Sequence, residues 1–234
     1  MTSTTIKSAY FRGVRDSMPY VLVIGPFALL FGVVATEAGL SIAETMGFTV
    51  LVIAGAAQFT AVQLLTENAP VWAILAASLG VNLRMAMYSA SLTPHLGAAP
   101  LWQRALIAYL NVDQAFAMAS LKYEQEPEMT VPEKVAYFFG TMSFIAPIWY
   151  VGTWVGAVAG SAIPPEYALD FALPITFLAL VAPAVRTLAH LAAAIVAIIV
   201  ALAAAGLPSG TGILLAGLAG MITGAEIERR MARQ

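Results

Sequence analysis

The stretch LWQRALIAYLNVDQAFAMASL, residues 101–121, decides how many times this chain crosses a membrane. It has the length of a transmembrane helix, which needs about 20 mostly apolar residues to span a hydrocarbon core about 30 Å thick. However, it carries Arg104, Asn111, Asp113 and Gln114, so hydropathy alone leaves its placement open.

The composition of the whole chain places it in a membrane. Hydrophobic residues make up 60% of its 234 residues and charged residues only 10%, against roughly 45–50% and about 25% in soluble domains. A soluble fold of this size cannot bury so much apolar surface, so lipid has to cover the rest. The formal net charge of −2 argues against nucleic acid as a partner, and the absence of cysteine removes disulfides and thiolate chemistry.

The distribution of Lys and Arg decides the placement of 101–121, because basic loops stay in the cytoplasm. If this stretch spans, all basic loop residues fall on one side and the opposite loops hold none. We therefore predict an all-α polytopic membrane bundle of about eight transmembrane helices, with both termini cytoplasmic. The other seven predicted spans are 18–37, 46–66, 71–93, 135–160, 168–184, 187–206 and 210–226.

Eight helices suggest one integral membrane domain over 1–234 with two four-helix halves, roughly 11–121 and 134–228, joined by the polar segment 122–134. Prolines within the spans can kink or break their helices, and interrupted helices are typical of substrate sites in secondary transporters. These prolines are Pro26, Pro147, Pro174 and Pro183.

Arg84 lies well inside the apolar run VNLRMAMYSASLTPHL, residues 81–96. On a helix it shares a face with Tyr88, Ser91 and His95. A buried cation costs at least about 2.5–3.5 kcal/mol, so such residues usually face a cavity or a partner.

Two acidic residues could neutralise Arg84. Asp113 is the deeper one and the better candidate for a role in proton transfer or substrate binding, whereas Asp170 is equally explained as a charge favoured by the start of a helix. Arginine and carboxylate side chains form strong, bidentate hydrogen-bonded pairs.

Small residues and amides mark further positions in the predicted spans. Gln58 follows a Gly-Ala-Ala run where a helix could unwind and expose backbone to a cavity, whereas Gln63 is expected to hydrogen-bond between helices. Two glycine faces predict close helix packing, either within the chain or against a partner subunit. They are formed by Gly152, Gly156 and Gly160, and by Gly220 and Gly224.

Four blocks of this sequence resemble the AzlC family of bacterial branched-chain amino-acid exporters. They are PFALLFGVVATEAGLS, AGAAQFTAVQLL, NLRMAMYSASLTPHL and LDFALPITFLALVAP. The resemblance implies an inner-membrane permease that exports valine, leucine, isoleucine and related amino acids such as methionine, together with a small AzlD-like membrane subunit. One departure is NVDQAF, where the family pattern has Thr directly before the Asp.

The residues that fall in the family's blocks, with NVDQAF included, are the candidate site. They are Gln58, Asn82, Arg84, Tyr88, Ser89, Asp113 and Asp170. A zwitterionic apolar ligand needs a cation, an acceptor for its ammonium and an apolar pocket. We predict that Arg84 supplies the cation and Asp113 the acceptor, with Gln58 and Asn82 as neutral hydrogen-bonding groups.

Three phenylalanines beside the suspected helix breaks are candidate walls of the apolar pocket: Phe27, Phe59 and Phe177. Asp113 and Asp170 are the candidates for ion coupling. Arg84 and Asp113 could instead form a structural ion pair that holds two spans in register.

A different class of function is a non-catalytic membrane subunit that packs against the true transporter. An enzyme is disfavoured, because the chain lacks HExxH, GxSxG, P-loop and dinucleotide motifs. We expect neither a cofactor nor a metal.

Overall fold

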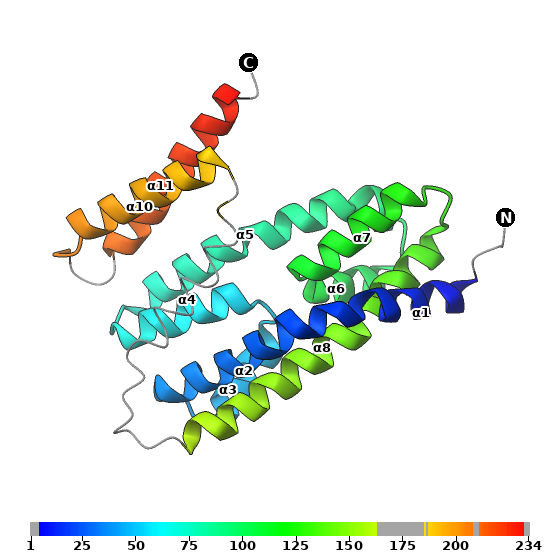
Figure 1. Ribbon diagram of the computed structural model, residues 1–234, viewed down its shortest axis with the longest axis horizontal. Helices are drawn as coiled ribbons and strands as arrows, with labels where there is room; N and C mark the ends of the chain where they lie inside the picture. Colours follow the sequence, from blue (N-terminus) through cyan, green and yellow to red (C-terminus); the bar gives the residue numbers. More distant parts are fainter. Residues whose placement is uncertain (1–4, 163–184, 186, 208–210, 232–234) are drawn as a thin grey trace. The chain divides into compact units, whose positions relative to one another are not determined.

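The computed structural model describes residues 5–162, 185, 187–207 and 211–231, and these form helices joined by turns, without a β-strand. The predicted all-α class is confirmed for this part of the chain (Figure 1). The helices are α1 (Ile6–Ser17), the 3₁₀ helix η1 (Met18–Tyr20), α2 (Val21–Glu37), α3 (Ile42–Leu51), α4 (Gly55–Thr66), α5 (Val71–Leu96), α6 (Leu101–Leu110), α7 (Asp113–Gln125), α8 (Val131–Ser161), α10 (Leu188–Ala203) and α11 (Thr211–Met231).

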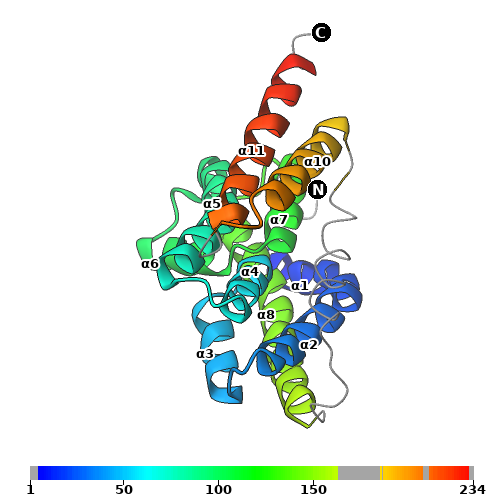
Figure 2. The same ribbon diagram turned by 90° about the vertical axis from the view of Figure 1, so that its left-hand side faces the viewer.

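The chain packs as two compact units. Unit 1 contains residues 1–59 and 79–163, and unit 2 contains residues 60–78 and 164–234. Within unit 1, α8 packs along α1 and α2 (Figure 1), and within unit 2, α10 packs along α11 (Figure 2). The predicted division into two four-helix halves stays a prediction.

Three helical stretches of the described residues are long and apolar enough to cross a membrane: Ile6–Glu37, Val71–Leu96 and Val131–Ser161. They match the predicted spans 18–37, 71–93 and 135–160. Leu188–Ala203 is a shorter apolar helix within the predicted span 187–206. The predicted span 168–184 lies outside the described residues, and the count of eight spans is not confirmed.

The long helices of unit 1 run parallel, with glycine at their closest approaches. Gly13 of α1 lies against the backbone of Tyr137, and Gly32 of α2 lies against that of Thr153, so the numbering of both partners rises together. A side chain at Gly156 would collide with the backbone of Leu29. The predicted glycine face of α8 therefore serves packing within the chain.

The second glycine face also packs internally. A Cβ atom added at Gly220 would lie 3.0 Å from the carbonyl oxygen of Ala193, and one at Gly224 would lie 3.3 Å from the Cβ of Ala193. Close approach of this kind is how helices associate without a hydrophobic driving force in lipid. Both faces are thus used inside the described units.

The segment predicted as the span 46–66 is interrupted. α3 ends at Leu51, and α4 begins at Gly55. The Nε2 of Gln58 donates to the hydroxyl of Thr49 over 2.9 Å, although nine residues of continuous helix would separate them by about 13.5 Å. The chain therefore turns back on itself at 52–54.

The segment 101–121 also reverses. The sequence predicts one crossing helix here, and the structure has two helices instead. α6 must start beside the end of α5, because only residues 97–100 connect them, and Asn111 at its far end contacts Ser89 of α5. α6 is therefore antiparallel to α5. In contrast, α7 runs parallel to α5, because the pairs Arg84–Asp113, Tyr88–Phe116 and His95–Tyr123 follow one another along both helices.

Neither reversal contains a proline. In the second, Asn111 has φ −78° and ψ 69°, and the amide of Val112 donates to the carbonyl of Leu110 over 2.8 Å. This is the geometry of an inverse γ-turn, and the amide of Ala54 makes the same type of bond to Val52 over 2.9 Å in the first.

The prolines do not break the two spans in which they can be checked. Pro26 and Pro147 lie inside α2 and α8, which continue through them. Membrane helices tolerate proline when neighbouring groups satisfy the freed backbone, whereas Asn competes for backbone hydrogen bonds and favours helix ends.

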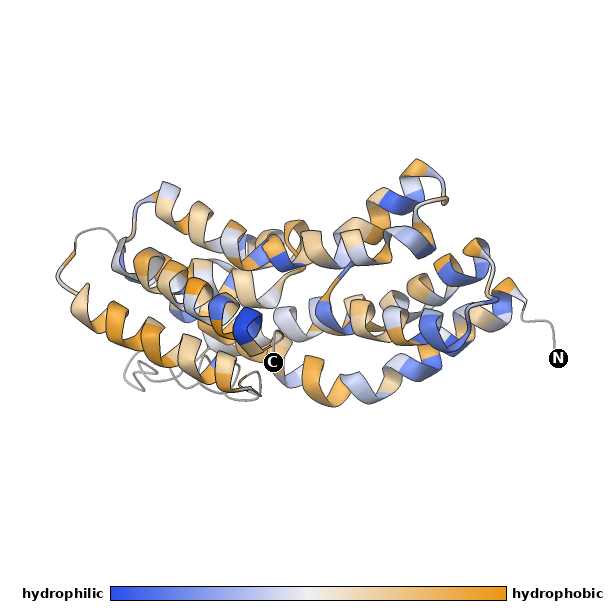
Figure 3. Cartoon of the chain, turned by 90° about the horizontal axis from the view of Figure 1, so that it is seen from above, coloured by the Kyte–Doolittle hydropathy of each residue, from blue (hydrophilic) through white to orange (hydrophobic). Residues whose placement is uncertain are grey.

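The surface of α5 carries an apolar stripe suited to lipid. Leu75, Leu79, Leu83 and Met87 follow one another at intervals of four residues, and each is at least 60% exposed. Figure 3 shows hydrophobic colours along most helices and hydrophilic patches toward the N-terminus. Soluble proteins rarely expose apolar stripes of this kind, whereas lipid covers them in a membrane.

Candidate functional site

Arg84 and Asp113 form an ion pair within unit 1. The Nη1 of Arg84 lies 2.7 Å from the Oδ2 of Asp113, and the two side chains are 32% and 40% exposed. Asp113 is the first residue of α7, where the helix dipole favours a negative charge. The pairing that the sequence suggested is therefore present in the structure.

The ion pair uses only part of its hydrogen-bonding capacity. The Nε of Arg84 and the Oδ1 of Asp113 are buried and without a hydrogen-bond partner among the described residues. The carboxamide oxygen of Asn82, two residues before Arg84, is in the same state. Unpartnered polar atoms in such a setting are costly, so this region is suited to receive a polar ligand or water.

Side chains of α5 and α7 flank the pair. The rings of Tyr88 and Phe116 stack, with centroids 4.2 Å apart and planes inclined by 10°. The amide of Asn111 donates to the hydroxyl of Ser89 over 3.4 Å. The structure therefore brings the predicted residues Arg84, Tyr88, Ser89 and Asp113 into one group.

The predicted residues Gln58, Phe27 and Phe59 belong to the other reversal. Gln58 and Phe59 are 0% exposed. The ring of Phe27 lies 5.0 Å from that of Phe59 and 5.6 Å from that of Trp149, and Phe31 adds a further ring 5.3 Å from Phe59. These rings pack on one another beside the start of α4.

Tyr109 links the two reversals. Its hydroxyl, at the end of α6, donates to the carbonyl of Val50 near the end of α3. The same hydroxyl lies 3.0 Å from that of Tyr150 on α8. One tyrosine thus ties both hairpins to the long central helix of unit 1.

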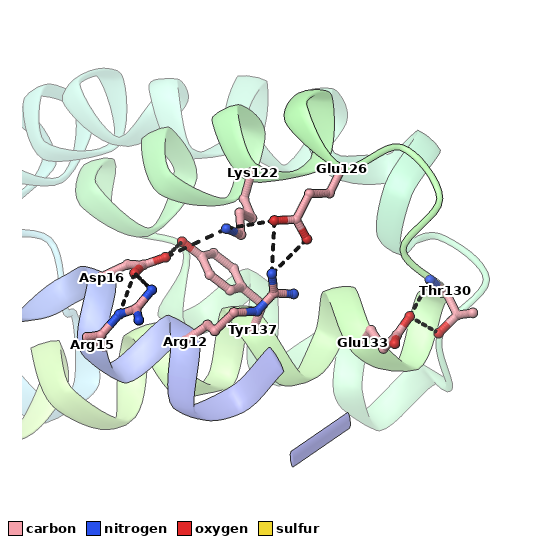
Figure 4. A network of polar contacts seen from close by, with 8 residues as sticks. All are labelled: Arg12, Arg15, Asp16, Lys122, Glu126, Thr130, Glu133 and Tyr137. Atoms are coloured by element: carbon pink, nitrogen blue, oxygen red, sulfur yellow. Dashed lines mark hydrogen bonds and ion pairs between the residues drawn. The ribbon is translucent and has the colours of Figure 1, made fainter. Parts of the chain in front are cut away.

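A second polar cluster lies at the end of unit 1 where α1 begins and α7 ends (Figure 4). Arg12 of α1 donates to both carboxylate oxygens of Glu126, at 2.9 and 2.8 Å, and Lys122 of α7 binds the same carboxylate at 2.9 Å. Asp16 accepts a hydrogen bond from Tyr137 of α8 over 3.2 Å. We call these five residues the anchor cluster, because they fasten α7 to α1 and α8.

The anchor cluster stabilises the ionised form of Glu126. The hydrogen bond from Lys122 is the main cause that lowers the pKa of Glu126, and Arg12 adds to it.

Nearby, Nζ of Lys134 lies 3.3 Å from Nδ1 of His95. On the predicted face of α5, Arg84 and Tyr88 meet the start of α7. His95 contacts Tyr123 of α7 as well as Lys134 of α8, and Ser91 is exposed.

Asp170 and Phe177 lie outside the described residues. The sequence reading singled out neither Asn111 nor Tyr109 as part of a site. The available signal was the triplet Asn-Val-Asp at 111–113, in which short polar residues that favour helix ends interrupt two apolar stretches. Within the described ranges, no group of three or more His, Asp or Glu side chains is placed to hold a metal ion.

Comparisons with known proteins agree with the membrane architecture. The chain is 28% identical over 178 residues to the inner membrane protein YgaZ of Escherichia coli, covering 73% of this chain and 71% of that protein. It is 31% identical over 227 residues to a membrane protein of Archaeoglobus fulgidus, covering 92% and 94%. A membrane protein of Helicobacter pylori is 26% identical over 156 residues, which cover 65% of this chain and 66% of the relative.

No solved structure matches the chain. The model of the family described as AzlC protein matches residues 19–163, which contain both reversals and the Arg84–Asp113 pair. The resemblance seen in the four sequence blocks is confirmed, and the chain belongs to the AzlC family.

Proposed function

We propose that this protein is a secondary transporter that exports branched-chain amino acids across a bacterial inner membrane. The observation that carries the proposal is the Arg84–Asp113 pair, which lies at a helix reversal and retains unpartnered polar atoms on both side chains. Interrupted helices with free polar groups are typical of transporter substrate sites. Membership of the AzlC family and the inner-membrane name of the E. coli relative support the same class.

The pair has the two charges that a zwitterionic amino acid needs. In this proposal the ligand carboxylate binds Arg84 and the ligand ammonium binds Asp113, so the ligand inserts between partners that otherwise bind each other. While the ligand is bound, each charge keeps a partner of opposite sign, which avoids the cost of leaving a partly buried charge unpaired. Tyr88 and Phe116 form an apolar wall for a branched side chain, and Asn82 supplies a neutral acceptor.

Gln58, Phe27 and Phe59 have a different place in the proposal. Gln58 is bonded to Thr49 and is fully buried, and the two rings pack in the aromatic cluster. We assign these three residues to the stability of the α3–α4 reversal. They keep the hairpin in position while the ligand binds at the charged reversal.

Proton coupling through Asp113 completes the proposed cycle. Protonation of Asp113 would remove its negative charge and so release the ammonium of the ligand. Arg84 would then face the neutral carboxyl group of Asp113. Asp170 remains a second candidate for coupling. No nucleotide-binding motif occurs in the sequence, so the proposed driving force is an ion gradient.

The proposed orientation places both termini in the cytoplasm, because the basic residues of the anchor cluster lie at the end of unit 1 that carries α1. A small AzlD-like membrane subunit is the proposed partner. The alternative of a non-catalytic subunit has lost its main support, because both glycine faces pack internally.

The proposal is tested by export of valine from cells fed a valine-containing dipeptide. Arg84→Ala should reduce export to the level of cells without the protein, while the amount in the membrane stays normal. Arg15→Ala removes an exposed cation of α1 (side chain 74% exposed) and should export normally. Normal export by Arg84→Ala would remove Arg84 from the transport site.

A reconstitution experiment tests the partner and the alternative together. Vesicles that contain this chain alone, the AzlD-like subunit alone, or both are loaded with valine, and efflux is measured. Transport that requires both, and that is lost in Arg84→Ala, supports the proposed function. Transport by the pair that survives Arg84→Ala would favour the non-catalytic reading.

A further inference from the structure

A half-open cavity of about 170 Å³ lies between α5 and α6 in unit 1. Its apolar side is formed by Leu92, Leu96 and Ile107, and its polar groups include Arg104, Ser89 and Asn111. The cavity therefore has room for a small polar ligand beside an apolar wall.

The two ends of the cavity differ in chemistry. Arg104 is exposed near the start of α6 and makes no ion pair within the described part of the chain. Asn111 is only 2% exposed, and its carboxamide oxygen has no hydrogen-bond partner. Seven residues of helix separate them, or about 10.5 Å and nearly two full turns, so both side chains point to the same face of α6.

We propose that this cavity is a first docking site for the amino acid, on the side of the membrane that holds the anchor cluster. This inference rests on the proposed transport function and adds a second site to it. The guanidinium of Arg104 receives the ligand carboxylate, and the apolar side formed by Leu92, Leu96 and Ile107 receives the branched side chain. The free oxygen of Asn111 accepts a hydrogen bond from the ligand ammonium.

The floor of the cavity leads to the charged reversal. Asn111 is two residues from Asp113, and it is bonded to Ser89, which lies five residues, or about 7.5 Å of helix, from Arg84. A ligand that leaves the docking site therefore meets Ser89 and Asn111 first and the Arg84–Asp113 pair next. Polar groups accompany it along the whole of this short path.

The cavity also belongs to one side of the membrane. Its lining residues Leu96 and Gly97 lie at the end of α5, next to His95, which contacts Lys134 at the start of α8. Export begins from the cytoplasm, and the basic residues mark this end as cytoplasmic under the positive-inside rule. The docking site is thus at the entry end of the proposed route.

The test uses inverted membrane vesicles, which expose the cytoplasmic side, prepared with the partner subunit and zwitterionic lipid. Uptake of labelled valine is measured against its concentration for wild type, Arg104→Gln and Lys7→Gln. Loss of a charged hydrogen bond should raise the half-saturating concentration by about tenfold or more in Arg104→Gln, with the maximal rate within about twofold. Lys7→Gln removes an exposed cation of the same end, outside the cavity, and should match wild type.

A second pair of variants fills the cavity without changing charge. Ala108→Leu places a larger side chain at the cavity lining, whereas Ala105→Leu changes an exposed position of α6 outside it. Only Ala108→Leu should raise the half-saturating concentration. Valine at the opposite face, in right-side-out vesicles, should show the same half-saturating concentration for all four variants and wild type.

The possible failures are distinguishable. If wild-type vesicles do not transport valine, the proposed function fails. If wild type transports valine but Arg104→Gln and Ala108→Leu both keep the wild-type half-saturating concentration, the docking site is refuted while the function stands. Equal effects on both faces of the membrane would also refute a docking site at the entry end.

Discussion

The two helix reversals of unit 1 share a backbone device and differ in chemistry. Each turns on a hydrogen bond between residues two apart, at 52–54 and at 110–112. The first is surrounded by packed aromatic rings and the neutral Gln58–Thr49 bond. The second holds a cation and an anion, whereas buried polar atoms without a partner among the described residues occur at both, since the Oε1 of Gln58 is one of them. A reversal alone is therefore compatible with a purely structural role, and the charges favour the second one as the proposed site.

The largest expected effect comes from exchanging the charges of the second reversal. In the double variant Arg84→Glu with Asp113→Arg, an ion pair can form again, so the protein should be present in the membrane at the wild-type level, as is expected for Arg84→Ala. Valine export should stay at the background level, because the ligand would meet its charges in the wrong order. Membrane content by immunoblotting and dipeptide-fed export are measured together.

The single variants provide the controls for this exchange. If the double variant restores export as well as membrane content, the pair is a structural ion pair and the contrast between the reversals disappears. If the single variants at positions 84 and 113 already reach the membrane in normal amounts, the exchange of charges tests only the binding of valine. The coupling between the two positions follows from the four variants of the cycle.

A middle-sized effect is expected at the first reversal. Phe59→Ala removes a ring that is 0% exposed and packs on Phe27 and Phe31, so it should destabilise the protein by about 3–5 kcal/mol. The protein that remains folded should keep the wild-type half-saturating concentration for valine. Thermal unfolding in detergent and vesicle uptake measure the two quantities.

Phe11→Ala is the matched control, because Phe11 is 67% exposed. Its unfolding temperature should change little. A changed half-saturating concentration in Phe59→Ala would give the neutral reversal a part in ligand binding and would remove the contrast.

The smallest effect concerns the anchor cluster, which holds the far end of the charged hairpin. The pKa of Glu126 is lowered in the folded protein from its ordinary value of 4.5, so its contribution to stability is present above that ordinary value and is lost as pH falls through the folded pKa. Glu126→Gln should lower stability by about 1 kcal/mol or less at neutral pH, since the side chain is partly exposed.

This difference should vanish in acid. Unfolding temperatures of wild type and Glu126→Gln, measured in detergent from pH 7 to pH 3, should approach each other as pH falls. A difference that persists unchanged at pH 3 would show that the carboxamide disturbs packing and that charge is not the cause.

The sequence predicted the helical class, the three long spans and the Arg84–Asp113 pairing, because each rests on local composition or on the cost of burying a charge. It predicted crossings at 46–66 and 101–121 where the chain reverses. When two crossings are replaced by two reversals, only the connections 67–70 and 97–100 move to the opposite side of the membrane. Neither connection contains Lys or Arg. The positive-inside rule therefore had no residue with which to distinguish the two arrangements.

The positions of the reversals could also not be predicted from the sequence. Proline was the expected breaker, yet Pro26 and Pro147 lie in continuous helices, because membrane helices accommodate proline through neighbouring groups. Asn111 and Val112 end a helix without any strong breaker. Their conformation depends on contacts such as Asn111–Ser89 and Tyr109–Val50, which join residues far apart in the chain.

The α6–α7 hairpin has a consequence for the synthesis of the protein. Because the chain enters and leaves at the same end of unit 1, neither Arg104 nor Lys122 has to be carried through the lipid during insertion. The hairpin contacts α8, which is made after it, so it can reach its final position only when α8 has emerged from the ribosome. We therefore expect biogenesis in two steps, with the long helices inserted first and the charged hairpin docked between them afterwards.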